Sequence, residues 1–343
     1  MVVFRIIYRT VIIFISLNLI TGYYVLKSQD LEKIIDLKGK WRFSISEKSD
    51  WEKNSFDDSN WDLVNVPSRW ENEGYYGYNG YGFYRKTFNS PSSVNSLTLE
   101  LHLGYIDDAD VVYLNGEIIG ASGSFPPNYS TAYKSFRRYV IPENLLKPRN
   151  NVLAIKVYDF ELTGGIVGGD IGIFKEKNAL VVIEDLRGKW KFKTGDNLAF
   201  KKTDYDDSKW DEIWVPSFWE NLGYRNYDGF AWYRKKVFIP QEYKDKTIVL
   251  ALGQIDDNDQ TFLNGKLVGQ IGDFDGNNVK QWSNYDYRQV RAYYLSPNQF
   301  KAGQYNLIAV RVYDIKKGGG MYEGVIALAE LKKFVLYWRN KNE

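Results

Sequence analysis

The stretch Asp36-Leu-Lys-Gly-Lys-Trp-Arg-Phe43 returns 149 residues later as Asp185-Leu-Arg-Gly-Lys-Trp-Lys-Phe192. Further motifs recur at the same offset: Asp-Asp-Ser-x-Trp-Asp from 57 and 206, Val-Pro-Ser-x-Trp-Glu-Asn from 66 and 215, and Ile-Asp-Asp-x-Asp from 106 and 255. So many ordered matches indicate an internal duplication. We therefore expect two copies of one module, at residues 31–183 and 184–335.

The expected secondary structure is β-strand in both copies. Residues 97–103 and 151–158 alternate apolar and polar side chains with the period of two that is typical of strands. Residues 111–119 contain Asn115-Gly116, the dipeptide that favours a type I′ hairpin turn. No segment after the N-terminus sustains a helical period, and residues 336–343 are expected to form a tail. The sequence thus predicts an all-β fold of two tandem jelly-roll β-sandwich domains.

Two features describe how the copies are joined and where they differ. The second copy is six residues longer between Gly272 and Arg291, where Gly, Asn, Ser and Tyr are typical of a loop. The link at 174–184 is short and lacks Pro and Gly, which predicts that the two modules pack against each other.

The N-terminus, residues 1–30, has the pattern of a targeting segment. Arg5 and Arg9 precede an apolar run at 10–26, which indicates a signal peptide or, alternatively, an uncleaved membrane anchor. The chain is therefore expected to be exported to the periplasm, the cell surface or the medium, with membrane contact only through this segment.

Composition excludes several classes of function. A formal net charge of +2 lacks the basic excess of a nucleic-acid-binding protein. The chain has no Cys, which excludes disulfides and thiolate chemistry. The chain has one His, His102, and the corresponding residue of the second copy is Ala251. We therefore expect His102 to be a surface or hydrogen-bonded strand residue rather than a catalytic base. The Gly-rich stretches at 164–169 and 318–324 are expected to be tight loops and not phosphate-binding loops.

In this order, the motifs resemble the sugar-binding, galactose-binding-like jelly-roll domain of glycoside hydrolase family 2, the β-galactosidase type. That resemblance covers nearly all of residues 33–335 and implies a β-sandwich that handles carbohydrate beside a catalytic barrel. Such a barrel takes about 250 residues, and only residues 330–343 follow the second copy. The first hypothesis is therefore an exported, non-catalytic carbohydrate-binding protein. The alternatives are a family 2-related hydrolase, or an accessory subunit of one, and a structural module that joins surface proteins.

Sugar recognition needs aromatic planes and polar side chains in a pre-formed site. The candidates are aromatic and polar side chains at matching positions of the copies: Trp70, Glu71, Tyr78, Asn79, Arg85 and Asp159 in the first, and Trp219, Glu220, Tyr227, Asp228, Trp232, Arg234 and Asp314 in the second. The resemblance favours Asn79, Asp228, Asp159 and Asp314, since the matching residues lie near the sugar in family 2 galactosidases. A structural role is the alternative for each candidate, and Trp41, Trp61, Trp190 and Trp210 are expected in the core.

The repeated acidic motif has three interpretations. Asp107, Asp108 and Asp110, with Asp256, Asp257 and Asp259, form a divalent-cation site, a set of general acid/base carboxylates or an Asp-rich turn. No organic cofactor is expected, and a structural cation such as calcium stays open. The expected partners are a glycan or oligosaccharide and, under the subunit hypothesis, a catalytic chain.

Overall fold

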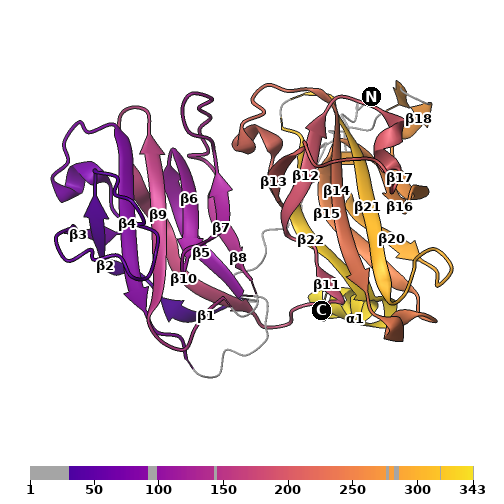
Figure 1. The fold of residues 1–343 in the computed structure, drawn as a ribbon, viewed down its shortest axis with the longest axis horizontal. Coiled ribbons are helices and arrows are strands. Elements are labelled where there is room, and N and C mark those ends of the chain that lie inside the picture. Colours follow the sequence, from indigo (N-terminus) through magenta and orange to yellow (C-terminus); the bar gives the residue numbers. More distant parts are fainter. Residues whose placement is uncertain are drawn as a thin grey trace, which may run out of the picture.

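The computed structural model describes residues 31–91, 99–142, 145–275, 278–281, 286–316 and 318–342. Two β-sandwich modules lie side by side, the first in indigo to magenta and the second in rose through orange to yellow (Figure 1). This confirms the expected all-β fold. The N-terminal segment, and with it the predicted targeting function, lies outside the described residues.

Each module is built from a four-stranded and a six-stranded antiparallel sheet. In the first module the four-stranded order is β1 (Leu31–Asp36), β10 (Gly165–Glu176), β5 (Leu99–Asp107) and β8 (Phe136–Ile141). The six-stranded order is β3 (Asp62–Val66), β2 (Gly39–Ser44), β4 (Gly80–Phe88), β9 (Asn151–Asp159), β6 (Ala109–Leu114) and β7 (Glu117–Ser122).

The second module repeats this order strand for strand. Its four-stranded sheet runs β11 (Glu184–Asp185), β22 (Gly320–Glu330), β15 (Ile248–Asp256) and β20 (Val290–Leu295). Its six-stranded sheet runs β13 (Asp211–Val215), β12 (Gly188–Thr194), β14 (Gly229–Ile239), β21 (Gln304–Asp314), β16 (Asn258–Leu263) and β17 (Lys266–Ile271). The extra residues of the second copy include a small hairpin, β18 (Asp273–Asp275) and β19 (Asn278–Gln281). The duplication therefore holds in topology as well as in sequence.

Short 3-10 helices join several strands. They are η2 (Trp70–Glu73), η3 (Leu198–Lys201), η4 (Trp219–Leu222), η5 (Gln241–Tyr243) and η6 (Asp286–Arg288). Of these, η2 and η4 occupy matching places in the two modules.

The two sheets of each module bury an apolar core between them, because alternate side chains of their strands face inward. Trp41 and Trp190 lie in these cores with their ring N–H groups donating to the backbone carbonyls of Leu37 and Leu186, each at 2.8 Å. Trp61 and Trp210 are buried outside the six-stranded sheets, under loop residues. The predicted core role of these four Trp residues is confirmed.

The predicted hairpin is confirmed in both modules. Asn115 and Gly116 have φ angles of 54° and 89°, and Asn264 and Gly265 have 49° and 81°. Two consecutive positive φ angles are what a type I′ turn requires.

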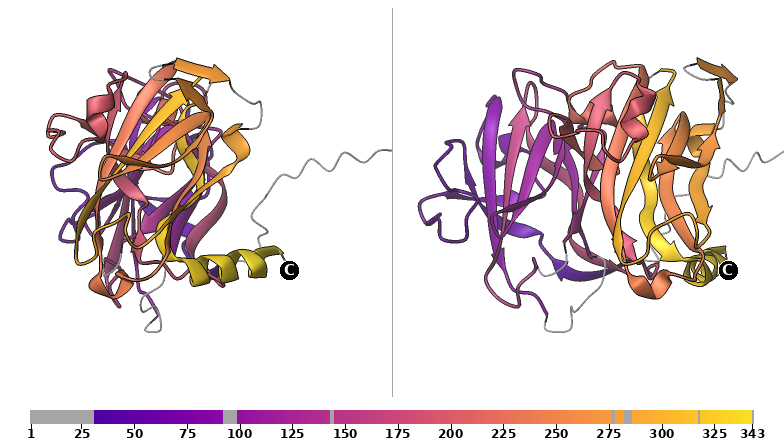
Figure 2. Two further views of the ribbon diagram at one scale, coloured as in Figure 1. Left: turned by 90° about the vertical axis from the view of Figure 1, so that its right-hand side faces the viewer. Right: turned by 45° about the vertical axis from the view of Figure 1, so that its right-hand side comes forward.

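The expectation of a C-terminal tail is wrong. Residues Leu331–Asn342 form α1, which lies at one end of the second module (Figure 2). Phe334 and Tyr337 are buried against Val249 and Ala329 of the sheet below, and this tertiary packing stabilises the helix, whose Leu331, Phe334 and Trp338 follow a helical period. Among the residues that the structure describes, no helix is long and apolar enough to cross a membrane.

The modules pack against each other, as the short link predicts. The Ser130 hydroxyl donates to the Glu220 carbonyl at 2.8 Å, and Arg187 pairs with Glu100 at 2.9 Å. The Tyr337 hydroxyl of α1 donates to Glu176 of the first module at 3.1 Å.

Candidate functional site: an acidic triad and an aromatic depression

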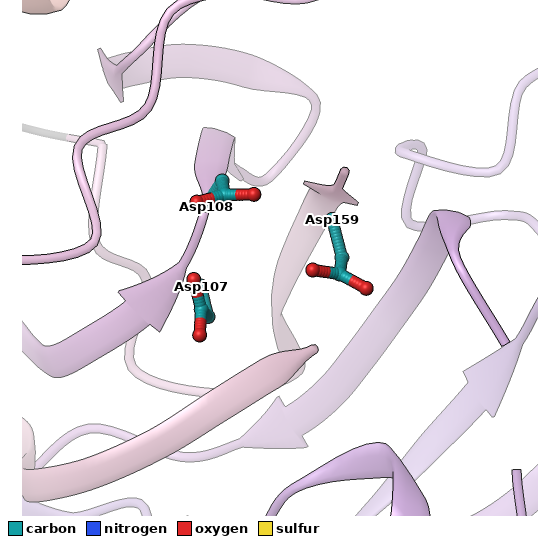
Figure 3. Close-up of side chains that lie close together, drawn as sticks. All are labelled: Asp107, Asp108 and Asp159. Carbon is teal, nitrogen blue, oxygen red and sulfur yellow. The ribbon is translucent and has the colours of Figure 1, made fainter. Parts of the chain in front are cut away.

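Each module carries three carboxylates at one end of its sandwich, and we name this set the acidic triad. It consists of Asp107, Asp108 and Asp159 in the first module (Figure 3) and of Asp256, Asp257 and Asp314 in the second. Within each triad, one oxygen from each carboxylate lies within 4.8 Å of the others. The structure thus joins the Asp-Asp motif to Asp159 and Asp314, which are predicted sugar-binding residues.

The topology explains this meeting. Asp107 ends β5 in the four-stranded sheet, and the chain crosses at Asp108 into β6 of the six-stranded sheet. Since β9 pairs with β6, its last residue, Asp159, ends at the same crossing. The second module repeats the arrangement at the crossing from β15 to β16.

Backbone and hydroxyl donors fix the central carboxylate of each triad. Asp108 accepts from the Phe160 N–H at 3.0 Å and from the Thr131 hydroxyl. Asp257 accepts from the Ile315 N–H at 3.0 Å. These donors lower the pKa of Asp108 against the opposing effect of burial. A charged central carboxylate is therefore held in place beside its two neighbours.

The carboxylates at the strand ends have fewer donors: Asp107 accepts from the Thr163 hydroxyl at 3.4 Å, and the Oδ1 of Asp314 accepts from the Lys316 N–H at 3.1 Å. Asp159 is fully buried and neither of its oxygens has a hydrogen-bond partner; in the second module the Oδ2 of Asp314 has none. Burial, with the charges of Asp108 and Asp107, raises the pKa of Asp159 to about 7. Burial and the charge of Glu220 raise the pKa of Asp314 to about 7. Burial next to the adjacent Asp likewise raises the pKa of Asp107 and of Asp256. The carboxylates of each triad thus repel one another, which favours the uptake of a proton or of a cation.

One glutamate from the preceding 3-10 helix stands near each triad. Both buried carboxylate oxygens of Glu71 lack a partner, whereas Glu220 accepts from the Gly319 N–H at 3.0 and 3.2 Å. Burial and the charge of Asp228 raise the pKa of Glu220 to about 7. The predicted residues Glu71, Glu220 and Asp228 therefore belong to the acidic surroundings of the triads.

Asp110 and Asp259 do not belong to the triads, which corrects the grouping suggested by the sequence. Each is fully buried and paired with an arginine: Asp110 with Arg137 at 2.7 Å and Asp259 with Arg291 at 2.9 Å. Both also accept from the hydroxyl of a core tyrosine. Their role is structural.

Besides Asp159 and Asp314, five further predicted sugar contacts lie in the interior. Trp70, Trp219 and Trp232 are 0–1% exposed. Arg85 and Arg234 are also buried, paired with Asp58 at 2.8 Å and Asp207 at 2.7 Å. A side chain without exposed surface offers no face to a sugar, so the expectation that these five line a binding surface is corrected.

The remaining candidates lie closer to the surface. Tyr78 and Tyr227 are half-buried, and their hydroxyls donate to the carbonyls of Tyr81 and Phe230 at 3.0 and 2.6 Å. Asn79 and Asp228 are exposed at the start of β4 and β14. Their contact with sugar stays a prediction.

His102 is a hydrogen-bonded strand residue and not a surface residue. Its ring is buried between Phe136 and Phe174, and its Nε2 lies 3.2 Å from a carboxylate oxygen of Glu100.

The second module has an aromatic feature that the sequence analysis missed. A shallow depression of about 290 Å³ is lined by Phe218, Glu220, Asn221 and Gly318. The Phe218 ring stacks on Tyr322 with centroids 4.6 Å apart and an interplanar angle of 9°. Aligning the copies could have drawn attention to it, since the first module has Arg69 and Val167 at these places.

The comparisons with known proteins agree with the architecture. Residues 47–162 match the family model described as the β-galactosidase second all-beta domain. This match covers most of the first module, and the second module repeats the motifs and the strand order of the first.

The relatives are longer proteins that this tandem matches only in part. A putative β-glucuronidase of Formosa agariphila is 30% identical over 134 residues, which cover 36% of this chain and 12% of the relative. A β-glucuronidase 2 structure from Bacteroides uniformis matches 85% of this chain and 28% of its own, with 16% identity and a TM-score of 0.37. The structure of a glycosyl hydrolase family 2 member from Bacteroides cellulosilyticus matches 83% of this chain and 31% of its own, with 14% identity and a TM-score of 0.35. The chain therefore spans less than a third of the length of these relatives.

Proposed function

We propose that this chain is an exported, non-catalytic carbohydrate-binding protein, and that the second module holds the sugar. The observation that carries the proposal is the depression at η4. It combines an aromatic ring, Phe218, with two polar side chains, Glu220 and Asn221. An aromatic plane suits the C–H face of a sugar, while a carboxylate and an amide suit its hydroxyl groups. Export rests on the N-terminal sequence pattern.

The test is calorimetric titration of the purified chain with galactosides, glucuronides and oligosaccharides selected on a glycan array. In the variant Phe218→Ala the loss of stacking, about 0.5–1.5 kcal/mol, is expected to weaken binding up to about tenfold. Glu220→Gln should weaken binding by a similar factor, because a charge-assisted hydrogen bond becomes a neutral one.

Phe160→Ala is the matched control, since Phe160 is an exposed aromatic ring of the first module that stacks on Tyr129 with centroids 5.1 Å apart. It should leave the affinity unchanged. If no glycan binds the wild type at millimolar concentration, or if Phe160→Ala weakens binding as much as Phe218→Ala, the proposal is wrong.

The second candidate function is glycoside hydrolysis, and one observation favours it. Burial raises the pKa of both Glu220 and Asp314 to about 7, with the charge of Glu220 adding to the effect at Asp314, and this range suits proton transfer at neutral pH. Against it stands the burial of Asp314, which leaves no room for a sugar between two catalytic carboxylates. Hydrolysis of nitrophenyl galactosides or glucuronides that is lost in Glu220→Gln would favour the enzyme over the binding protein.

A further inference from the structure

We infer that each acidic triad binds one divalent cation of the calcium type, so that the chain carries two such ions. This goes beyond the proposed function, since it concerns ion binding in both modules and does not depend on a sugar. The observation that carries it is the burial of Asp159, whose unpartnered carboxylate points toward Asp107 and Asp108 (Figure 3).

The donor set suits a hard cation. All three side chains of a triad offer carboxylate oxygens, the ligands that Ca²⁺ prefers at 2.3–2.6 Å. Two ligands on opposite sides of an ion with bonds of about 2.4 Å lie about 4.8 Å apart. Three oxygens within 4.8 Å of one another lie at most about 2.8 Å from a common centre, so shifts of a few tenths of an ångström bring all three to the Ca²⁺–oxygen bond length. Three carboxylates supply between three and six of the six to eight oxygens that Ca²⁺ takes, and water or backbone carbonyls can supply the rest.

In the part of the chain that the structure describes, no basic side chain is paired with the triad carboxylates to balance their charge. No lysine or arginine there forms an ion pair with any of the six triad carboxylates. Arg137 and Arg291 bind the backbone carbonyls of Asp108 and Asp257, but their ion pairs are with the carboxylates of Asp110 and Asp259. An unpaired carboxylate in the interior is costly, and a bound cation removes that cost.

The position of the triad indicates what the ion would do. It lies where the chain crosses between the two sheets, and Asp108 also binds the N–H of Phe160 in the segment after β9. In the second module the corresponding segment runs from Asp314 toward Gly319, whose N–H binds Glu220. A cation would therefore tie the sheet crossing to the loop that borders the depression.

The test uses the full chain after removal of metal by a chelator. Calorimetric titration with CaCl₂ should give a stoichiometry of two for the wild type, one for Asp159→Asn or Asp314→Asn, and zero for the double variant. Thermal unfolding should show a rise in Tm with CaCl₂ in the wild type and none in the double variant. MgCl₂ should bind more weakly, because Mg²⁺ requires shorter bonds and a regular octahedron.

Two controls keep the result interpretable. Asp170→Asn removes an exposed carboxylate that pairs with Lys33 at 3.0 Å and Lys38 at 3.1 Å, and it should retain two sites. In metal-free protein, Asp159→Asn should unfold at or above the wild-type Tm, because the amide removes repulsion between like charges. A metal-free Tm below that of the wild type, no binding at millimolar Ca²⁺, or two sites in the double variant would each overturn the inference.

Discussion

The two modules share an acidic end and differ in the side chains around it. Both place a triad at the sheet crossing with a glutamate nearby, but Glu71 has no hydrogen-bond partner while Glu220 accepts from the Gly319 N–H. The first module has Arg69 where the second has Phe218, which lines the depression. The shared part is thus acidic and buried, and the differing part is aromatic and open to solvent.

This difference separates two roles that the sequence analysis combined in one site. A feature that both copies keep in the interior suits a role common to both, such as ion binding or cohesion of the fold. A feature present in one copy and open to solvent suits recognition of a ligand by that copy. The comparison therefore assigns the triads to both modules and the sugar to the second.

The largest expected effect is a loss of unfolding free energy, and it tests whether the buried Arg–Asp pairs of the two modules are equivalent. Arg137 pairs with Asp110 and donates to the carbonyls of Ile106 and Asp108 at 2.8 and 2.7 Å; Arg291 repeats the pattern. Replacing either arginine with leucine leaves a buried carboxylate unpaired, and we expect a loss of about 3–5 kcal/mol from the module concerned. Urea unfolding followed by Trp fluorescence measures it. Losses below about 1 kcal/mol, or very unequal ones, would contradict the equivalence.

The architecture could be predicted from the sequence because its signals are local. Strand alternation, the Asn115-Gly116 turn and the repeated motifs each lie within a few residues, and all were confirmed. The acidic triad could be predicted only in part. Asp107 and Asp108 are adjacent in the chain, but Asp159 joins them through the pairing of β6 with β9, a contact between distant segments.

The incorrect site assignments have the same physical origin. Asp110 is next to the motif in sequence, yet its partner Arg137 comes from β8, 27 residues away. Trp70 and Trp219 were predicted to stack on a sugar, because the sequence does not show which residues cover an aromatic ring. In the structure, Gly164 and Gly319 lie against them so closely that an added Cβ would come within 2.3 and 2.1 Å of the ring atoms.

The next effect concerns the contact between the modules. Burial alone would raise the pKa of Glu100, but the hydrogen bond of His102 and the charge of Arg187 lower it to about 2. A carboxylate with a lowered pKa contributes stability above about pH 4.5, and this contribution is lost as the pH falls toward 2. We expect the Glu100→Gln variant to lose about 1 kcal/mol at pH 7 and to show a smaller further loss than the wild type between pH 4.5 and 2. The second module has Val249 at the matching place, so it has no ionisable group there whose titration could change its stability. Identical acid profiles for the wild type and the variant would contradict this assignment.

A smaller effect tests whether the aromatic pair is enough for recognition. The double variant Arg69→Phe, Val167→Tyr gives the first module the pair that Phe218 and Tyr322 form in the second. If stacking carries the recognition, calorimetry should detect a second sugar site about tenfold weaker than the first, since stacking contributes about 0.5–1.5 kcal/mol. A stoichiometry that stays at one would show that the surrounding polar groups are also required.

The smallest effect concerns one exposed position beside the triads. Asp228 raises the pKa of Glu220 and of Asp314 through its negative charge, whereas the first module has the neutral Asn79 at the matching place. If the triads bind calcium, this extra charge should make the second site the tighter of the two. Because Asp228 is exposed, solvent screens its charge, and we expect a difference of about two- to fivefold in Kd, which is below 1 kcal/mol. Asp228→Asn should weaken the second site and Asn79→Asp should strengthen the first, each by a similar factor. Both shifts should shrink as the salt concentration rises, because screened charges interact less. Two sites with equal affinities in the wild type would show that the charge at this position does not reach the ion, and that the modules differ only in their aromatic surroundings.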